Sequence, residues 1–349
     1  MKKITLALAM LVITSCLYAQ QDDFSDNERV NYIQPSPEAA TLINSVNNAV
    51  DLYTGTLHVD VPLYTLKTKS FTIPVGLNYA ATGLKVQELA GLAGAGFSIK
   101  GGGAITRVVR GLPDEDDKGY SHANGIGHKL SGTLTIEEAD QVLRGEMDGE
   151  PDLFYFSVPG ASGKFVLDHT GKSVLMPYQD ITIQPEIGPK SSSNNQWVIK
   201  MPNGDSYTFG TYDGTTDVDY TSSKHPYRSE PVEFISTWHL KQMVSSITND
   251  EVTFQYLNGM VTTVTQYHQD ISDVTDNSEM NCTNGDLPIS TGVRDINTIV
   301  TTTPKYLWKV KANKTTVTFD YGSVRSDYPN QSGDYLRKIL VSYTGKSPT

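Results

Sequence analysis

A glycine-rich stretch between two strand-like segments constrains the fold of this chain more than any other feature. Six glycines fall among the thirteen residues from Gly91 to Gly103. Apolar runs flank the stretch, residues 71–77 before it and residues 104–109 after it. Glycine permits positive φ angles and close backbone approach, at an entropic cost inside regular elements. We therefore predict a buried, tightly bent connection between two strands, at which side chains would not fit.

The spacing of these glycines does not fit the loops that bind nucleotide phosphates. Gly94 and Gly96 match the first two positions of the dinucleotide-binding pattern G-x-G-x-x-G, but Ile99 occupies the third. A strand pattern follows, whereas this motif opens a helix. Two other segments match the end of a Walker A loop, but apolar residues replace its first glycine, at Val166 and Leu340.

The charge balance argues against nucleic acid and anionic lipid as partners. The chain has 28 Lys and Arg against 39 Asp and Glu, and its net charge is −11. Nucleic-acid-binding proteins usually carry a basic stripe or patch, and the sequence shows none. An acidic surface also repels anionic membranes.

Residues 1–19 have the layout of a secretory signal peptide. Lys2 and Lys3 precede an apolar segment, residues 4–14, that is too short to span a bilayer, and Ala19 offers a small residue at a cleavage site. A second interpretation stays open, because the residues that end at Cys16 resemble a bacterial lipobox, in which this cysteine is lipidated. Either way we expect an exported protein, extracellular or on the outer cell surface. No other apolar run is long enough for a transmembrane helix.

Periodicity predicts an all-β protein with two short helices. From residue 56, apolar and polar residues alternate, which predicts a strand with His58 on its solvent side. Residues 71–79 predict the next strand, in which Pro74 favours an edge or bulge position. After residue 151 strands alternate with turns, and Asn-Gly pairs favour hairpins. The strongest strand signals lie at residues 153–158, 165–167, 181–184, 197–201, 207–209, 238–247, 252–257, 260–267, 306–310, 315–321 and 336–343.

Helix and loop signals complete the organisation of the chain. One helix begins at Ser36, with proline at its first position, and another spans residues 135–144, where Thr135 and Glu138 form a capping box. Residues 270–303 lack an apolar period, so we predict a long surface loop there. The regions we expect are a signal peptide at residues 1–19, a flexible leader at 20–35, an N-terminal β region at 36–150 and a hairpin-rich β region at 151–349.

The sequence contains no complete catalytic or metal-binding motif, and we predict no catalytic, cofactor-binding or metal residues. Residues 114–119 resemble the opening of a calcium loop, but Lys118 and Gly125 occupy two of its ligand positions. A solvated turn and a looser calcium site are the two interpretations that remain. The same two interpretations apply to Asp213, Asp217 and Asp219.

Other reactive residues lack partners at suitable spacing. His122 and His128 form the one close histidine pair, without a third zinc ligand nearby. Cys282 has no neighbouring base, which is typical of an inert thiol. The sequence does not single out a glycosidase-type carboxylate pair among its 39 acidic residues. Arg107 and Arg110 could hold an anion, but exposed pairing with the acids of residues 114–117 is the simpler expectation.

A series of short motifs, in their order and spacing, resembles one known family. The matching segments are residues 74–79, 83–86, 94–98, 103–107, 110–115, 150–156, 163–166, 202–205 and 207–210. Together they resemble the N-terminal region of secreted Rhs/YD-repeat proteins, which are related to the shell subunits of toxin complexes. Phe97 departs from the pattern, because the family usually has tryptophan there, and the turn after Lys100 is richer in glycine than usual. These motifs are architectural rather than catalytic.

The resemblance implies a structural role. It implies a non-catalytic N-terminal part of an exported shell, whose partners are the downstream repeats and the C-terminal cargo region of the same polypeptide. Two alternatives remain. One is a surface β-sandwich that binds glycan or protein, and the weaker one is a secreted hydrolase. A binding module would expose aromatic side chains on one face, with Trp197, Trp238, Tyr220 and Tyr227 as candidates.

Overall fold

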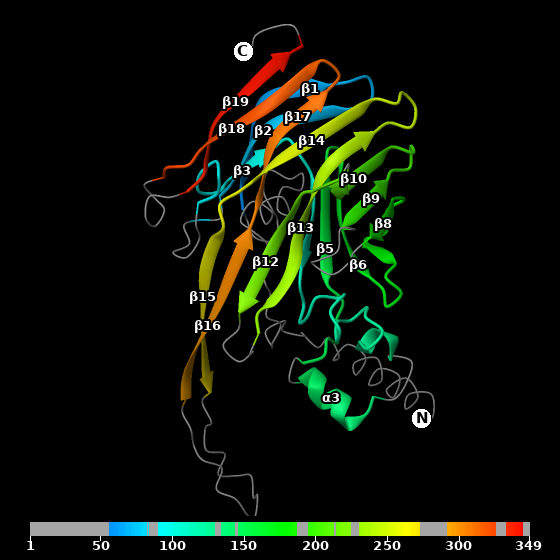
Figure 1. Ribbon diagram of the computed structural model, residues 1–349, viewed down its shortest axis with the longest axis vertical. Coiled ribbons are helices and arrows are strands. Elements are labelled where there is room, and N and C mark those ends of the chain that lie inside the picture. Colours follow the sequence, from blue (N-terminus) through cyan, green and yellow to red (C-terminus); the bar gives the residue numbers. More distant parts are fainter. Residues whose placement is uncertain are drawn as a thin grey trace, which may run out of the picture. The chain divides into compact units, whose positions relative to one another are not determined.

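The predicted all-β class is confirmed. The computed structural model describes residues 56–81, 83, 90–129, 134–143, 146–186, 195–212, 214–224, 230–272, 292–325 and 333–344. Antiparallel strands dominate this part of the chain, accompanied by the helix α3 (Ile136–Leu143) and the short 3-10 helix η1 (Ile126–His128) (Figure 1). Inter-residue contacts divide the chain into residues 1–31 and 32–349, and every described residue belongs to the second unit. The signal peptide, Cys16, the leader, the helix at Ser36 and Cys282 lie outside the described residues.

The first sheet has three strands in the order β1 (His58–Lys67), β2 (Thr72–Ala80), β3 (Phe97–Lys100). Strand β3 pairs only with residues 76–79 of β2, so Pro74 lies where β2 has a single neighbour, β1. Proline has no N–H group to donate to a neighbouring strand, so it is tolerated where a strand has only one neighbour.

A bulge in β1 changes the side-chain alternation that the sequence predicts. The register with β2 shifts between Pro62 and Tyr64. Such a bulge inserts an extra residue, so Tyr64 and Leu66 beyond it lie on the same face as Val59 and Val61 before it. Leu66 is buried in the core, whereas Val59 and Val61 are 42 % and 38 % exposed. His58 is half-buried rather than solvent-facing, and that prediction was wrong.

The second sheet has sixteen strands, and β13 (Val232–Val244) is its centre. Different parts of this strand pair with β4 (Ala104–Val108), β10 (Ser206–Tyr212), β12 (Val218–Lys224) and β14 (Glu251–Asn258). From β13 one arm continues through β14, β17 (Lys305–Ala312), β18 (Thr315–Gly322) and β19 (Tyr335–Tyr343) (Figure 1). The other arm continues through β4, β5 (Leu153–Val158), β6 (Ala161–Leu167) and β7 (Ser173–Met176). The branches hold β8 (Thr182–Glu186), β9 (Gln196–Lys200), β11 (Thr215–Thr216), β15 (Thr262–Ser272) and β16 (Gly292–Thr303).

The predicted glycine-rich connection is confirmed in part, because it also contains a strand that the sequence did not predict. Strand β3 lies inside the stretch, after Gly96, and residues 101–103 lead from β3 of the first sheet into β4 of the second. A Cβ atom on Gly103 would lie 2.7 Å from the carbonyl oxygen of Ser157, and one on Gly96 would lie 2.9 Å from that of Ala80. Gly96 also has a φ of 74°, which L side chains rarely adopt.

One apolar cluster joins the two sheets. Trp197 and Trp238 are fully buried, with ring centroids 5.5 Å apart in an edge-to-face arrangement. Phe154 packs against both tryptophans. Leu66 and Ile73 of the first sheet belong to the same cluster. Both sheets therefore bury their inner faces in a shared core, as two-layer β-proteins do.

The predicted loop at residues 270–303 is wrong in part. Residues up to Ser272 belong to β15, and residues 292–303 form β16, which pairs with β15 along its whole length. Residues 273–291 lie outside the described residues.

Strand β12 was not predicted from the sequence because the residues it buries include polar ones. Thr221 of β12 donates a hydrogen bond to Ser236 across the pair, at 2.8 Å. The eleven strand segments predicted from the sequence all fall within or next to observed strands.

Candidate functional site

Three buried aspartates come together at one end of the β4–β5 pair, and we call them the aspartate cluster: Asp114, Asp148 and Asp152. Asp114 lies in the loop that follows β4, while the other two precede β5. Because β4 and β5 pair antiparallel, the end of one strand lies beside the start of the other. Gly111, with a φ of 86°, turns the chain against Asp148, so that a Cβ there would meet the Oδ1 atom of Asp148 at 2.7 Å.

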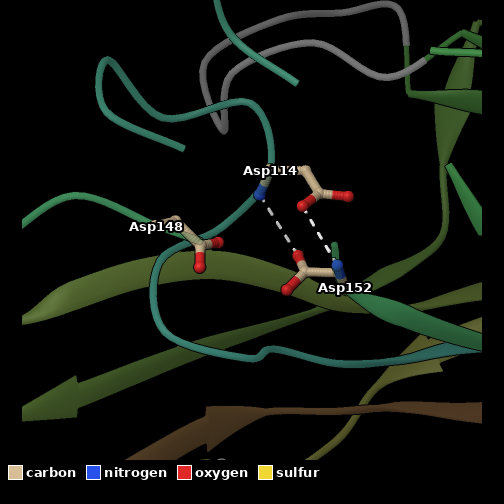
Figure 2. Close-up of side chains that lie close together, drawn as sticks. All are labelled: Asp114, Asp148 and Asp152. Carbon is tan, nitrogen blue, oxygen red and sulfur yellow. Dashed lines mark hydrogen bonds between the residues drawn. The ribbon is translucent and has the colours of Figure 1, made fainter. Parts of the chain in front are cut away.

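Hydrogen bonds from the backbone fix two of these carboxylates (Figure 2). The amide of Asp114 donates to Oδ2 of Asp152 at 3.2 Å, and the amide of Asp152 donates to Oδ1 of Asp114 at 3.0 Å. Oδ1 of Asp152 also accepts from the amide of Arg110 at 2.9 Å. One oxygen from each of the three carboxylates lies within 4.8 Å of the other two. The loops are thus joined reciprocally, and the carboxylates converge.

Arg107 lies beside the cluster and is fully buried. Its guanidinium donates to both carboxylate oxygens of Glu115, at 2.6 and 3.1 Å, and lies 3.6 Å from Oδ2 of Asp152. The same group lies 5.3 Å from the ring centre of Phe234 and 5.5 Å from that of Trp238. The predicted pairing with an acid of residues 114–117 is therefore confirmed, since Glu115 is one of them. The predicted exposure was wrong for Arg107, because β4 places this side chain inside the aromatic core.

Burial makes ionisation of the cluster unfavourable. Desolvation raises the pKa of Asp148 to about 8 and that of Asp114 to about 7. It also raises the pKa of Asp152 well above its ordinary value, against the opposing effect of Arg107. The Oδ2 atoms of Asp114 and Asp148 are buried without a hydrogen-bond partner. The cluster therefore needs positive charge, either from protons or from a bound cation.

The calcium-like run that the sequence shows belongs only partly to this site. Asp114 joins the cluster, whereas Asp116 and Asp117 lie exposed in the turn. Asp117 accepts a hydrogen bond from the side-chain amide of Asn124 at 2.8 Å. Sequence reasoning missed Asp148 and Asp152. The available signal was weak: two aspartates stand on either side of Glu150 and a proline, just before an apolar strand.

A second group of buried acids already has lysine and histidine partners. Asp217 contacts the ammonium groups of Lys241 and Lys305. Asp219 pairs with Nε2 of His239 at 2.8 Å and accepts from the amide of Lys305 at 2.7 Å. These contacts compensate the charge without a metal, which favours a structural ion-pair network. Asp213 lies outside the described residues.

The remaining candidates from the sequence do not form a site. His128 packs edge-to-face on His169, and His122 lies near Asp117 at 3.9 Å. Arg110 contacts Glu150 at 3.7 Å in an exposed pair. Among the described residues, the aspartate cluster is the one group of three or more potential metal ligands that lie close together.

A cavity of about 290 Å³ lies on the strands β4 to β7, away from the cluster. Its lining is mostly apolar and contains one amine, that of Lys164. The lining residues are Ala104, Thr106, Tyr155, Phe156, Ser157, Ser162, Gly163, Lys164, Met176, Pro177 and Gln179. No carboxylate or imidazole is among them.

Comparisons with known proteins do not place the chain in a family. It matches no protein-family model, and no curated protein sequence matches it significantly. Within the described part of the chain, no helix has the length and apolar character needed to cross a membrane.

Proposed function

We propose that this chain is a non-catalytic structural module, the N-terminal part of an exported shell of the Rhs/YD-repeat type. The observation that carries the proposal is the antiparallel sheet that extends from β13 through β14, β17, β18 and β19. Among the described strands, β19 pairs only with β18. Apart from Leu336, whose amide donates to the carbonyl oxygen of Leu92, and Val341, which has a partner of its own, such an edge presents backbone donors and acceptors on which a further hairpin can pair. The motifs at residues 74–115 and 150–210 support the same proposal.

The side chains matching the family motifs are used in packing. Phe154 and Phe156 of β5 are buried in the core, and Phe209 of β10 is fully buried. Gly103 and Gly210 occupy positions at which a Cβ would approach a backbone carbonyl oxygen, at 2.7 and 2.1 Å. Residues of these types specify turns and cores rather than proton transfer, which supports a scaffold.

The two alternative functions have less support. Trp197 and Trp238, which a glycan-binding surface would expose, are 0 % exposed. Tyr220 is half-buried, and Tyr227 lies outside the described residues. For a hydrolase, the converging carboxylates are buried and do not line the cavity described above. A substrate would have no path to them through that cavity.

The proposal is tested by expressing the complete product of the reading frame that contains this chain. Electron cryomicroscopy should then show a closed β-shell in which β19 pairs with a strand from a later segment. A product that ends near residue 349 and binds glycans on an array would instead favour the binding module. Hydrolysis of a glycoside or ester, lost on substitution of Asp148, would favour the enzyme.

We also propose that the mature protein is exported, because residues 1–19 have the layout of a signal peptide. Mass spectrometry of protein from its native host should find Gln20 or a lipidated Cys16 at the N-terminus. An intact Met1 on that protein would contradict export by this route.

A further inference from the structure

We propose that the aspartate cluster binds a hard divalent cation, calcium, through the carboxylates of Asp114, Asp148 and Asp152. This inference rests on the geometry of the cluster and does not depend on the proposed shell function.

The spacing of the carboxylates suits one calcium ion. Calcium binds oxygen ligands at about 2.3–2.6 Å, so two oxygens on the same ion lie at most about 5 Å apart. The three candidate oxygens all lie within 4.8 Å of one another. In Figure 2 the carboxylates of Asp148 and Asp152 point toward one another, with that of Asp114 beside Asp152. Calcium takes six to eight oxygen ligands, so backbone carbonyl oxygens and water would complete the shell.

Unpartnered oxygens are the second, independent observation. Asp148 is 4 % exposed and Asp114 is 1 % exposed, yet the Oδ2 atom of each has no hydrogen-bond partner. Buried carboxylate oxygens almost always have a donor or a metal, because leaving them bare in a low-dielectric interior is costly. The other oxygens of these carboxylates are already fixed by amides, Oδ1 of Asp148 by the amide of Glu150 at 3.1 Å. Asp114 and Asp148 are thus each held in place by one oxygen, while the second has no donor. Both oxygens of Asp152 accept amide hydrogen bonds, so this residue would bind the ion through a remaining lone pair.

The charge balance selects a cation and argues for two positive charges. The cluster and Glu115 together carry four carboxylates, and among the described residues Arg107 is the one guanidinium that pairs with them. Arg110 is in contact with Glu150, so this pair adds no net charge. Full ionisation would therefore leave an excess of three negative charges around a buried space. A divalent ion removes most of that excess, whereas a bound anion would increase it.

The Asp217–Asp219 group provides an internal comparison. There, Lys241, Lys305 and His239 contact the two carboxylates directly. Within the described part of the chain, no lysine or histidine forms an ion pair with the aspartate cluster, and its single arginine also pairs with Glu115. The protein thus compensates one buried acidic group with its own side chains and leaves the other for an external cation.

The test uses the mature chain, stripped with chelator and transferred to chelator-free buffer near neutral pH. Isothermal titration calorimetry with CaCl2 should show saturable binding to one site, and calcium should raise the melting temperature. MgCl2 is titrated in parallel, because its shorter bonds and stricter octahedral geometry predict weaker binding. An absence of saturable calcium heat and of any melting shift in the wild-type protein overturns the proposal, and the cluster is then neutralised by protons.

Two variants locate the site. Asp148→Asn removes one ligand charge with little change in shape, and it should abolish the calcium-induced melting shift while circular dichroism confirms the fold. Asp117→Asn is the matched control, because Asp117 lies in the same acidic run but outside the cluster. It should bind calcium as the wild type does. Calcium binding retained in Asp148→Asn, or lost equally in Asp117→Asn, contradicts the proposed ligands. If Asp148→Asn does not fold, Asp114→Asn replaces it with the same expected loss.

Discussion

At the scale of single residues, Gly103 is the position with the least room for a side chain in the connection between the sheets. A Cβ there would lie 2.7 Å from the carbonyl oxygen of Ser157 and 3.1 Å from the side chain of Leu240. Gly103→Ala should therefore reduce the free energy of unfolding by about 1–3 kcal/mol, through overpacking. Gly102→Ala is the matched control, since its nearest neighbours lie at an ordinary 3.5 Å. Equal urea midpoints for the two variants would show that the connection is not tightly packed.

Arg107 is the second residue whose environment makes a sharp prediction. Replacing it with methionine leaves Glu115 and Asp152 without their cationic partner inside the protein. Removing one member of a buried pair typically costs about 3–5 kcal/mol, so Arg107→Met should lower the stability by that order. Arg337→Met removes an exposed partner of Asp320 and should change the urea midpoint little. A similar small change in both variants would mean that the buried pair contributes no more than a surface pair.

Gly103 and Arg107 show which properties of a single residue can be predicted from the sequence and which cannot. The need for glycine was predictable, because a dense run of glycines between two strands indicates backbone that must bend where no side chain fits. The burial of Arg107 was not, because its neighbours Asp152, Phe234 and Trp238 come from distant parts of the chain. For the same reason the sequence singled out Asp114 but could not bring Asp148 and Asp152 to it.

At the scale of elements, the sequence predicted the helix that local interactions specify, but it missed a strand that forms by pairing with its neighbours. Helix α3 was predicted from its capping box, and both reciprocal bonds are present: the amide of Thr135 donates to Glu138 at 3.0 Å, and the amide of Glu138 donates to Thr135 at 3.2 Å. Strand β16 was missed because its residues lack an apolar period. It forms by pairing with β15 on one side and, over residues 299–303, with β12 on the other.

The register of β15 and β16 gives a prediction for this missed hairpin. Thr263 and Thr301 are register partners whose hydroxyl oxygens lie 3.2 Å apart. In a background with Cys282 replaced by serine, Thr263→Cys with Thr301→Cys should form a disulfide on mild oxidation. Thr265→Cys with Thr301→Cys is the control, because diagonal neighbours lie about 7–8 Å apart, beyond disulfide reach. Mass spectrometry after proteolysis identifies the bond. Preferential cross-linking of the control pair would show a different register.

At the scale of the whole molecule, β13 connects parts of the chain that are far apart in sequence. It pairs with β4 from the N-terminal region and with β10, β12 and β14 from the later hairpins. The first sheet shares its core with this second sheet, through Leu66, Phe71, Ile73 and Val75. The boundary expected near residue 150 falls just before β5, which pairs with β4 on one side and β6 on the other. Pairing thus continues across it, and the two regions share the second sheet.

The edge of that sheet at β19 allows the proposed shell to be tested at this scale. Backbone amides of β19 alternate between those that face β18 and those that face away, since strands bond to their two neighbours in turn. In residues 1–349 expressed alone, the amides that face away should exchange with deuterium rapidly. Two residues are left out of this prediction: Leu336, whose amide donates to the carbonyl oxygen of Leu92 at 2.7 Å, and Val341, which has a partner of its own. In the complete product of the reading frame the rapidly exchanging amides should become protected, because a following strand would accept their hydrogen bonds. Residues 315–318 of β18, which pair with both β17 and β19, should exchange slowly in both proteins and serve as the control. Rapid exchange of the same β19 amides in the complete product would mean that no strand is added at this edge, and that the sheet does not continue into a shell there.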